Sequence, residues 1–370
     1  MAPFTFYGPT RVIFGDGVVG EAGKHLLFSD NFLIVAGRGS AVATGHLDKL
    51  LAALSGKKVT VITGISPNPR LSEINAAAAR GLSAGATAVI GLGGGSALDA
   101  AKAAAAVMAG ADISALLLED KPAPENTLPI VCIPTTAGTG TETSQAAIVS
   151  DDTRGIKQGL RGAALIPRVA IVDPDLLATL PDIVAAETGF DVLTHALETW
   201  VSRRHSPLTA IYSRHAIATV FKHLPLFLSD RDRRESHREM ALASLMMGWN
   251  LSNSTTALPH RMQYPVGART DTSHPAGLAS LYPAWSRRAA LAAPEPFEFI
   301  ASLAGEAKAS DGRDCLLSFM KSIGVNRRLS DFGISLADCP ALALAVQGNL
   351  SADPCDSSLK ALQELYEASV

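Results

Sequence analysis

The chain has 370 residues, of which 47% are hydrophobic and 18% charged, and its formal net charge is −3. This length is enough for two domains of ordinary size, and the large apolar fraction excludes a mainly disordered chain. The nearly balanced charge gives no electrostatic reason to expect a nucleic acid or an anionic membrane as partner.

The cysteines and the N-terminal residues indicate where the protein works. Its 4 cysteines are scattered without CxxC spacing, so neither a disulfide framework nor a cysteine zinc site is expected. The first residues lack the basic and apolar segments of a signal peptide. The alanine-rich run over 97–109 contains Asp99 and Lys102 and is too short to cross a bilayer. We therefore predict a cytoplasmic protein with no membrane partner.

The first half of the chain alternates short β-branched runs with stretches rich in alanine and leucine. Strands are predicted over residues 31–36, 58–63, 86–92, 129–134 and 169–174. Apolar strands separated by helices imply βαβ units and a mostly parallel sheet. The sequence thus predicts an α/β domain over residues 1–178.

After Pro181 the pattern changes to apolar residues at helical spacing. The stretches 183–202, 207–228 and 234–251 show this spacing and carry few strand signals. We predict an all-helical domain over residues 179–370.

A glycine-rich segment, Gly93-Gly-Gly-Ser96, lies where the third strand should end and a helix should begin. Glycines let a phosphate approach the backbone, and a helix N-terminus offers N–H groups to it. Ser96 is expected to cap that helix. The spacing is not GxGxxG, so a simple tight turn is the alternative. A second polar loop, Thr135-Thr-Ala-Gly-Thr-Gly-Thr-Glu142, follows the next strand and favours a nucleotide site.

A carboxylate and three imidazoles follow in the helical half. Asp191 and His195 lie at i and i+4 on one helix face, and His260 precedes His274 by fourteen residues. One carboxylate with three imidazoles suits a single Fe²⁺ or Zn²⁺ ion. For any one of these histidines alone, a buried hydrogen-bonded side chain is the commoner role.

These motifs together resemble the iron-containing (group III) alcohol dehydrogenase family, with the maleylacetate reductases as near relatives. The resemblance rests on Gly93-Gly-Gly-Ser-x-x-Asp99-x-Ala-Lys102, on the Pro134–Glu142 loop and on Gly189-Phe-Asp-Val-Leu-Thr-His-Ala-Leu-Glu198. It covers essentially the whole chain. It implies the fold shared with dehydroquinate synthase, in which a dinucleotide-binding domain precedes a helical one, and it implies a homodimer.

The resemblance also assigns residues to two sites. The metal ligands would be Asp191, His195, His260 and His274. The cofactor residues would be Asn68, Gly94, Gly95, Ser96, Asp99, Thr135, Thr136, Thr139 and Lys157. Asp99 has a second interpretation, as a residue that only begins the helix.

The end of the strand over 31–36 bears on the choice of cofactor. Family members that prefer NAD tend to carry a carboxylate there, which binds the ribose 2′-OH and repels a 2′-phosphate. This chain has Gly37-Arg38-Gly39-Ser40 instead. Arg38 either pairs with the phosphate or is a solvated arginine in a turn. We predict NADP(H), with NAD(H) as the alternative.

One departure from the family affects catalysis. The family segment His-x-x-x-His-Pro-x-Gly reads His260-Arg-Met-Gln-Tyr264-Pro-Val-Gly267 here. The second histidine, which is thought to help proton transfer near the nicotinamide, is therefore a tyrosine. Tyr264 replaces it as the proton relay, or protons pass through water, or activity is weakened.

The predicted activity is hydride transfer between NADP(H) and a small aldehyde, ketone or alcohol in the cleft between the domains. The metal would act as a Lewis acid on the substrate oxygen. The nearest alternative is a maleylacetate-reductase-like reduction of a keto acid, which the presence of Asp191 disfavours. A dehydroquinate-synthase-like lyase or cyclase and a degenerate nucleotide-binding protein are alternatives of other classes. The sequence leaves open the physiological substrate, the reaction direction and the choice between Fe²⁺ and Zn²⁺.

Overall fold

The computed structural model describes residues 3–118 and 125–370. The chain forms two compact units. One contains Tyr7–Leu180 and Asp232–Gly248, and the other contains Pro181–Arg231 and Trp249–Val370 together with the N-terminal residues up to Phe6.

A parallel sheet forms the centre of the first unit. Within the described residues it has six strands, in the spatial order β1-β8-β5-β4-β2-β3. The strands are β1 (Arg11–Phe14), β2 (Asn31–Gly37), β3 (Lys58–Ile65), β4 (Ala88–Gly93), β5 (Ile130–Pro134) and β8 (Val169–Val172). The predicted parallel α/β architecture is confirmed. The inner strands β2, β4, β5 and β8 are apolar runs buried on both faces of the sheet, whereas the edge strands β1 and β3 are largely half-buried or exposed.

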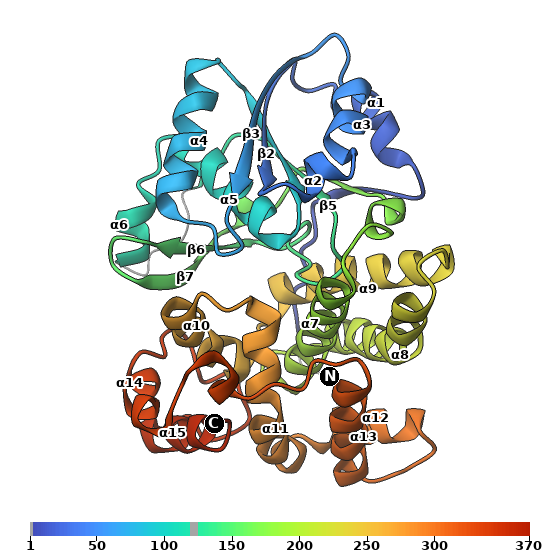
Figure 1. The fold of residues 1–370 in the computed structure, drawn as a ribbon, viewed down its shortest axis with the longest axis vertical. Helices are drawn as coiled ribbons and strands as arrows, with labels where there is room; N and C mark the ends of the chain where they lie inside the picture. The colour runs from blue at the N-terminus through green and yellow to red at the C-terminus, as the bar shows by residue number, and fades with distance from the viewer. Residues whose placement is uncertain (1–2, 119–124) are drawn as a thin grey trace. The chain divides into compact units, whose positions relative to one another are not determined.

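Successive residues of β2 point to opposite faces of the sheet, and helices cover both. Phe32 and Ile34 belong to one buried cluster, whereas Leu33 and Val35 belong to the other. Figure 1 shows α4 (Leu71–Ser83) and α5 (Gly95–Met108) on one side of the strands and α1 (Ala22–His25) and α3 (His46–Ala53) on the other. The short helices α2 (Ser40–Ala43) and α6 (Ile113–Leu118) complete the helices before β5.

A two-stranded antiparallel hairpin lies apart from the main sheet. It consists of β6 (Ala146–Asp151) and β7 (Ile156–Arg161). It was not predicted, because its residues form neither a continuous apolar run nor a regular apolar–polar alternation. The hairpin begins at Ala146, shortly after the Thr135–Glu142 loop.

The second unit is built from helices in its described residues, as predicted. They include α7 (Asp182–Val201), α8 (Pro207–Ser229), α10 (Leu258–Thr270), α11 (His274–Ala292), α12 (Pro294–Leu303), α13 (Ala309–Ser322), α14 (Cys339–Leu344) and α15 (Leu359–Glu367). The helices α7 and α8 pack closely at Gly189, where a Cβ would lie 2.5 Å from a methyl carbon of Leu224.

Most of α9 (Arg234–Asn253) packs with the α/β unit, although the sequence places it in the helical half. Two glycines make the contact close: a Cβ on Gly140 would lie 2.4 Å from the backbone nitrogen of Gly248. The Ser244 hydroxyl accepts the Gly138 N–H at 2.9 Å, and Thr143 donates to the Leu245 carbonyl at 2.9 Å. Thus α9 supports the Thr135–Glu142 loop.

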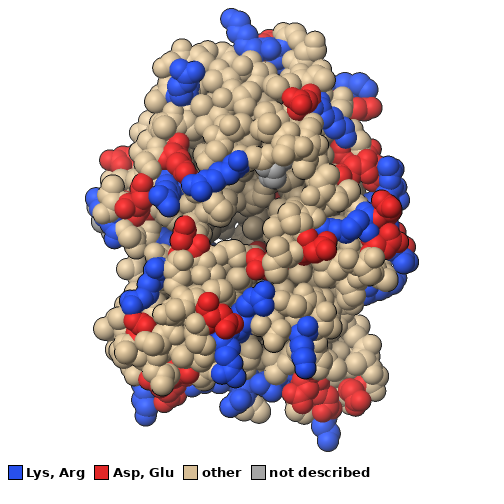
Figure 2. Space-filling model, in the orientation of Figure 1, with Lys and Arg blue, Asp and Glu red and all other residues tan. Residues whose placement is uncertain are grey.

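The surface charge agrees with the small net charge. On the face shown in Figure 2, Lys and Arg side chains are interspersed with Asp and Glu side chains. Among residues 3–118 and 125–370, none of the helices combines the length and apolar character needed to cross a membrane.

Candidate functional site

The turn between β4 and α5 has the geometry of a phosphate loop. Gly93 has φ +146°, a conformation that favours glycine, and Gly94 is the N-cap of α5 with no side chain of its own. The adjacent loop lies close, because a Cβ on Gly95 would be 2.4 Å from Thr139 Cγ2. A Cβ on Gly94 would likewise lie 3.3 Å from Thr136 Cγ2. Among the described residues no side chain caps the N-terminus of α5, so its N–H groups can bind an anionic group.

Other predicted cofactor residues lie around this turn. Thr135 donates its backbone N–H to the Gly93 carbonyl at 2.9 Å. Lys157 Nζ, on β7, donates to Asn68 Oδ1 at 2.8 Å, and both residues are buried. Ser96 differs from the expectation of a helix cap: it lies inside the first turn of α5, and its hydroxyl donates to the Pro67 carbonyl.

Asp99 and Lys102 form a buried network behind the loop. Thr141 donates to Asp99 Oδ1 at 2.5 Å, and the Ile148 N–H donates to Oδ2 at 2.9 Å. Lys102 Nζ donates to Thr141 Oγ1 at 2.9 Å, to the Ser144 carbonyl at 2.8 Å and to the Ala146 carbonyl at 2.9 Å. Both oxygens of Asp99 thus bind the chain itself, which gives it a part in holding the loop.

Burial dominates the electrostatics of this network. Desolvation raises the pKa of Asp99 and lowers the pKa of Lys102, and the attraction between their charges opposes both shifts. Desolvation also raises the pKa of the nearby Glu142 to about 7. Groups of this kind are stable only with their partners in place.

At the end of β2, the exposed side chain of Arg38 is held by the turn after β3. Its Nη2 donates to Ser66 Oγ at 2.6 Å and lies 4.0 Å from Glu73 Oε1. Glu73 also accepts the Ser66 hydroxyl at 2.5 Å. Gly37 ends β2, Gly39 follows with φ +150°, and Ser40 begins α2 with a side chain that lies outside what the structure describes.

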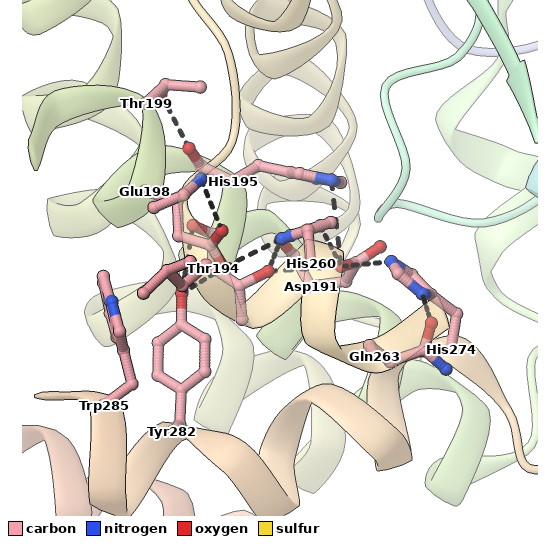
Figure 3. A network of polar contacts seen from close by, with 12 residues as sticks. Asp191, Thr194, His195, Glu198, Thr199, His260, Gln263, His274, Tyr282 and Trp285 are labelled. Atoms are coloured by element: carbon pink, nitrogen blue, oxygen red, sulfur yellow. Dashed lines mark hydrogen bonds and ion pairs between the residues drawn. The ribbon is translucent and has the colours of Figure 1, made fainter. Parts of the chain in front are cut away.

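The four candidate metal ligands come together in the helical unit (Figure 3). Asp191 and His195 lie one turn apart on α7, and donor atoms of these two residues and of His260 lie within 4.8 Å of one another. From Asp191 Oδ1 the distance is 3.9 Å to His195 Nε2, 3.8 Å to His260 Nε2 and 4.0 Å to His274 Nε2. Ligands of a single Zn²⁺ or Fe²⁺ ion lie roughly 3–4 Å apart, so the spacing suits one ion.

The burial of Asp191 also fits a metal. Its side chain is fully buried, and Oδ2 has no hydrogen-bond partner among the described residues. A buried carboxylate oxygen without a partner is unfavourable, and a divalent cation would satisfy it. His274, at the start of α11, is the most exposed of the four, with 24% of its side chain accessible. Ser273, the N-cap residue of α11, donates its hydroxyl to Glu187 Oε2 on α7 at 2.8 Å.

Glu198 supports this group from the next turns of α7. Its Oε1 contacts His260 Nδ1 at 2.8 Å and accepts the Tyr282 hydroxyl at 3.1 Å. Its Oε2 accepts the Ala257 N–H at 2.8 Å, at the start of α10. Burial raises the pKa of Glu198 to about 8, and the Ala257 N–H partly opposes that shift. When it is ionised, Glu198 accepts the Nδ1 proton of His260 and directs Nε2 toward Asp191.

A second buried carboxylate, Asp353, fixes the same helix end. Its Oδ2 accepts the Leu258 N–H at 2.7 Å and the Trp285 indole N–H at 2.9 Å. Two N–H groups at the start of α10 are thus bound by Glu198 and Asp353, which lie far from each other in the sequence. The sequence analysis does not single out either of them for this role. For Glu198 the one available signal is its spacing: it follows Asp191 by seven residues and so lies on the same helix face.

Two further side chains of α10 lie near the candidate ligands. Gln263 Oε1 is 2.6 Å from His274 Nδ1, and Gln263 is fully buried. Tyr264 follows His260 by one turn on the same helix face, and its ring centroid lies 6.3 Å from that of His274. The sequence analysis predicts a role for Tyr264 but not for Gln263.

Comparison with known proteins identifies the class. The family model described as iron-containing alcohol dehydrogenase matches residues 9–174, and the model of the C-terminal part of the same family matches residues 185–370. The chain belongs to the iron-containing alcohol dehydrogenase family, and it is an enzyme of that type. The family predicted from the sequence is confirmed.

Individual relatives agree with this assignment. The chain is 32% identical to the probable alcohol dehydrogenase EutG of Escherichia coli (strain K12), over 98% of this chain and 94% of that protein. It is 34% identical to the 1-propanol dehydrogenase PduQ of Salmonella typhimurium, over 75% of this chain and 70% of that protein. The structure of an archaeal alcohol dehydrogenase from a Red Sea brine pool has a TM-score of 0.93 and 26% identity, with complete coverage of both chains.

Proposed function

We propose that this enzyme transfers hydride between NADP(H) and a small aldehyde, ketone or alcohol, with Asp191, His195, His260 and His274 holding one divalent metal ion. The observation that carries the proposal is the convergence of three imidazole Nε2 atoms at 3.8–4.0 Å from one oxygen of buried Asp191. The imidazole and carboxylate donors suit Fe²⁺ or Zn²⁺.

The metal, when bound, supplies Lewis-acid polarisation of the substrate oxygen. The chain's own residues set the charge and shape of that site. One carboxylate and three neutral imidazoles leave a site with a divalent ion at a net charge of +1, which favours negative charge on the substrate oxygen. Glu198 and Asp353 keep His260 in place by binding the start of α10.

Tyr264 is the residue that we propose moves the proton. It lies on the His260 face of α10. During reduction its phenol can donate the Oη proton to a substrate oxygen, which leaves the phenolate, and during oxidation the phenolate can accept the proton back. We expect Tyr264→Phe to lower kcat about 100-fold, the usual contribution of general acid–base catalysis, and to leave metal content unchanged. Steady-state kinetics with metal analysis check this. A kcat within twofold of wild type would assign the proton to water instead.

The dinucleotide is proposed to bind in the α/β unit. Gly94, Gly95 and Ser96 lie at the open N-terminus of α5, where a pyrophosphate gains N–H donors and a favourable dipole. Thr135, Thr136 and Thr139 line the adjacent loop, and the bonded pair Asn68 and Lys157 lies on the adenosine side. Asp99 is proposed to act indirectly, by holding Thr141.

We propose a preference for NADP(H) over NAD(H), since β2 ends in Gly37 without a carboxylate and Arg38 is held at this point by Ser66. Relatives with a stated cofactor include an NAD-dependent methanol dehydrogenase of Bacillus methanolicus and a sulfoacetaldehyde reductase solved with NAD⁺. For this chain, Arg38→Ala is expected to raise KM for NADPH about tenfold and to leave KM for NADH within twofold, because only the 2′-phosphate would lose a partner. Arg38→Lys, which keeps the charge, is the control. An equal effect on both cofactors would contradict the assignment.

The function is tested by reconstituting metal-free protein with Fe²⁺ or Zn²⁺ and measuring NADPH oxidation with aldehydes, ketones and keto acids, with NADH in parallel. We expect metal-dependent oxidation with small aldehydes and a higher kcat/KM for NADPH. Faster NADH turnover would overturn the cofactor preference. A keto acid as the only substrate would favour the maleylacetate-reductase-like activity, and no oxidation at all would favour a degenerate nucleotide-binding protein.

We also propose that the protein is a cytoplasmic homodimer. Its four cysteines are free thiols, in keeping with a reducing compartment. Light scattering should give a mass twice that of one chain, and cell fractionation should recover the protein with cytoplasmic markers. A monomeric mass would contradict the dimer, and recovery in another fraction would contradict the location.

A further inference from the structure

Gln263 is a buried amide whose side chain makes a single hydrogen bond within the described part of the chain. It lies on α10 between His260 and Tyr264, and its Oε1 is 2.6 Å from His274 Nδ1 (Figure 3). Its Nε2 is buried without a hydrogen-bond partner among the described residues. Burying an amide that makes one hydrogen bond is less favourable than burying an apolar side chain of similar size. The contact with His274 therefore explains why a glutamine occupies this position.

The backbone of α11 fits closely around this amide. A Cβ on Gly277 would lie 2.9 Å from Gln263 Nε2 and 3.0 Å from its Cγ. Gly277 follows His274 by three residues, so the helix that carries the histidine also confines the glutamine. The amide is therefore fixed in place relative to the imidazole.

The orientation of the amide decides which nitrogen of His274 can bind a metal. An amide oxygen facing Nδ1 accepts the Nδ1 proton, and the lone pair of the neutral ring is then on Nε2. Nε2 is the nitrogen that lies 4.0 Å from Asp191 Oδ1. An amide nitrogen facing Nδ1 would instead place the ring proton on Nε2 and prevent ligation there.

We propose that Gln263 is a positioning residue that holds His274 as its Nδ1–H tautomer and so presents Nε2 to the metal. This inference rests on the metal site of the proposed function. Helix α10 then contributes two residues to that site: His260, a candidate ligand, and Gln263, the hydrogen-bond acceptor for His274.

The acceptors behind the two histidines differ in chemical type. The buried His260 contacts the carboxyl group of Glu198, whereas the partly exposed His274 contacts a neutral amide. A glutamate at position 263 would keep an acceptor of the same length, and a methionine would keep the volume without the acceptor. These two substitutions separate hydrogen bonding from packing.

The experiment compares Zn²⁺ affinity, by competition with a chromophoric chelator, in wild type, Gln263→Met and Gln263→Glu. Losing the partner of a metal-bound histidine weakens binding typically 10–100-fold, and we expect about this loss in Gln263→Met. Gln263→Glu should remain within about threefold of wild type, because the acceptor is kept. In the Co²⁺-loaded protein, the exchangeable proton signal of one ligand imidazole should be lost or broadened by Gln263→Met only.

Ser280→Ala is the matched control, since Ser280 is buried on α11 and its hydroxyl donates to the Gly277 carbonyl of the same helix at 2.7 Å. It should leave Zn²⁺ affinity unchanged. If Gln263→Met does not fold, Gln263→Asn replaces it, because the shorter amide cannot reach Nδ1. Tight metal binding by wild type together with equal affinity in Gln263→Met, or a Gln263→Glu variant as weak as Gln263→Met, would overturn the positioning role alone. Absence of stoichiometric binding in wild type would overturn the proposed metal site itself.

Discussion

Replacing Asp191 by asparagine is expected to abolish stoichiometric metal binding and, with it, reduction of aldehydes. Changes to groups that merely support a ligand weaken metal affinity about 10–100-fold, so losing the only anionic ligand should cost at least about 100-fold. The change removes one charge and almost no volume. Metal content after dialysis and the Zn²⁺ dissociation constant measure the effect.

The stability of the metal-free protein provides a second and independent result. Asp191 Oδ2 is buried without a hydrogen-bond partner among the described residues, so neutralising the side chain should leave the metal-free protein as stable as wild type or more stable. Added Zn²⁺ should raise Tm in wild type and not in the variant, because a ligand that binds only the folded state stabilises it.

The control for this substitution lies on the same helix. Asp182, at the start of α7, has 80% of its side chain exposed and an ion pair with Arg231 at 3.3 Å. Asp182→Asn should bind metal as wild type does. If Asp191→Asn retained full metal content and activity, the proposed ligand set would be wrong.

Replacing Lys102 by methionine is expected to destabilise the protein by about 3–5 kcal/mol, the range for removing one partner from a buried charged network. Lys102 is fully buried and makes three hydrogen bonds of 2.8–2.9 Å to the loop and hairpin after β5. Methionine fills similar space but leaves these acceptors, and the nearby carboxyl group of Asp99, without the cation. Urea unfolding measures the change.

The same variant should weaken cofactor binding, because the anchored loop carries Thr136 and Thr139. The NADPH dissociation constant from fluorescence titration should therefore rise together with the loss of stability. Lys360→Met is the control: this lysine has 87% of its side chain exposed, so the change should stay within about 0.5 kcal/mol. A destabilisation below about 1 kcal/mol in Lys102→Met would show that the network does not hold the loop.

Pairing the substitutions tests the network directly. Lys102→Met combined with Asp99→Asn should be less destabilised than the sum of the two single variants, since the neutral partner no longer needs a buried cation. Strict additivity would mean that the two side chains act independently.

The five predicted strands are present in the structure, because each is a short β-branched or apolar run visible in its own residues. Four of them, β2, β4, β5 and β8, are buried on both faces, and β3 lies half-exposed at the edge of the sheet. The hairpin of β6 and β7 was not predicted, because its residues form neither a continuous apolar run nor a regular apolar–polar alternation. The prediction that Ser96 caps α5 was wrong: Gly94 is the N-cap, and the Ser96 hydroxyl donates to the distant Pro67 carbonyl.

For the candidate metal site, the candidate ligands could be predicted from the sequence, but the residues that hold them in place could not. Asp191 and His195 share a helix face by spacing alone, so their proximity is a local property. His260 and His274 reach them only because α11 packs against α7 and α10 packs against α11. Glu198 and Gln263 acquire their partners through the same packing, and no sequence spacing specifies those contacts.

By itself, the sequence determined the parallel sheet, the helical second half, the glycine turn at the N-terminus of α5 and the membership in the iron-containing alcohol dehydrogenase family. These follow from periodicity and motifs within short stretches of chain. Only the tertiary structure decided that residues 232–248 pack with the α/β unit, that Lys102 binds the segment from Thr141 to Ala146 and that Glu198 and Gln263 contact His260 and His274. The physical reason is that each of these contacts joins residues from different elements, and only the packing of those elements brings them within hydrogen-bonding distance.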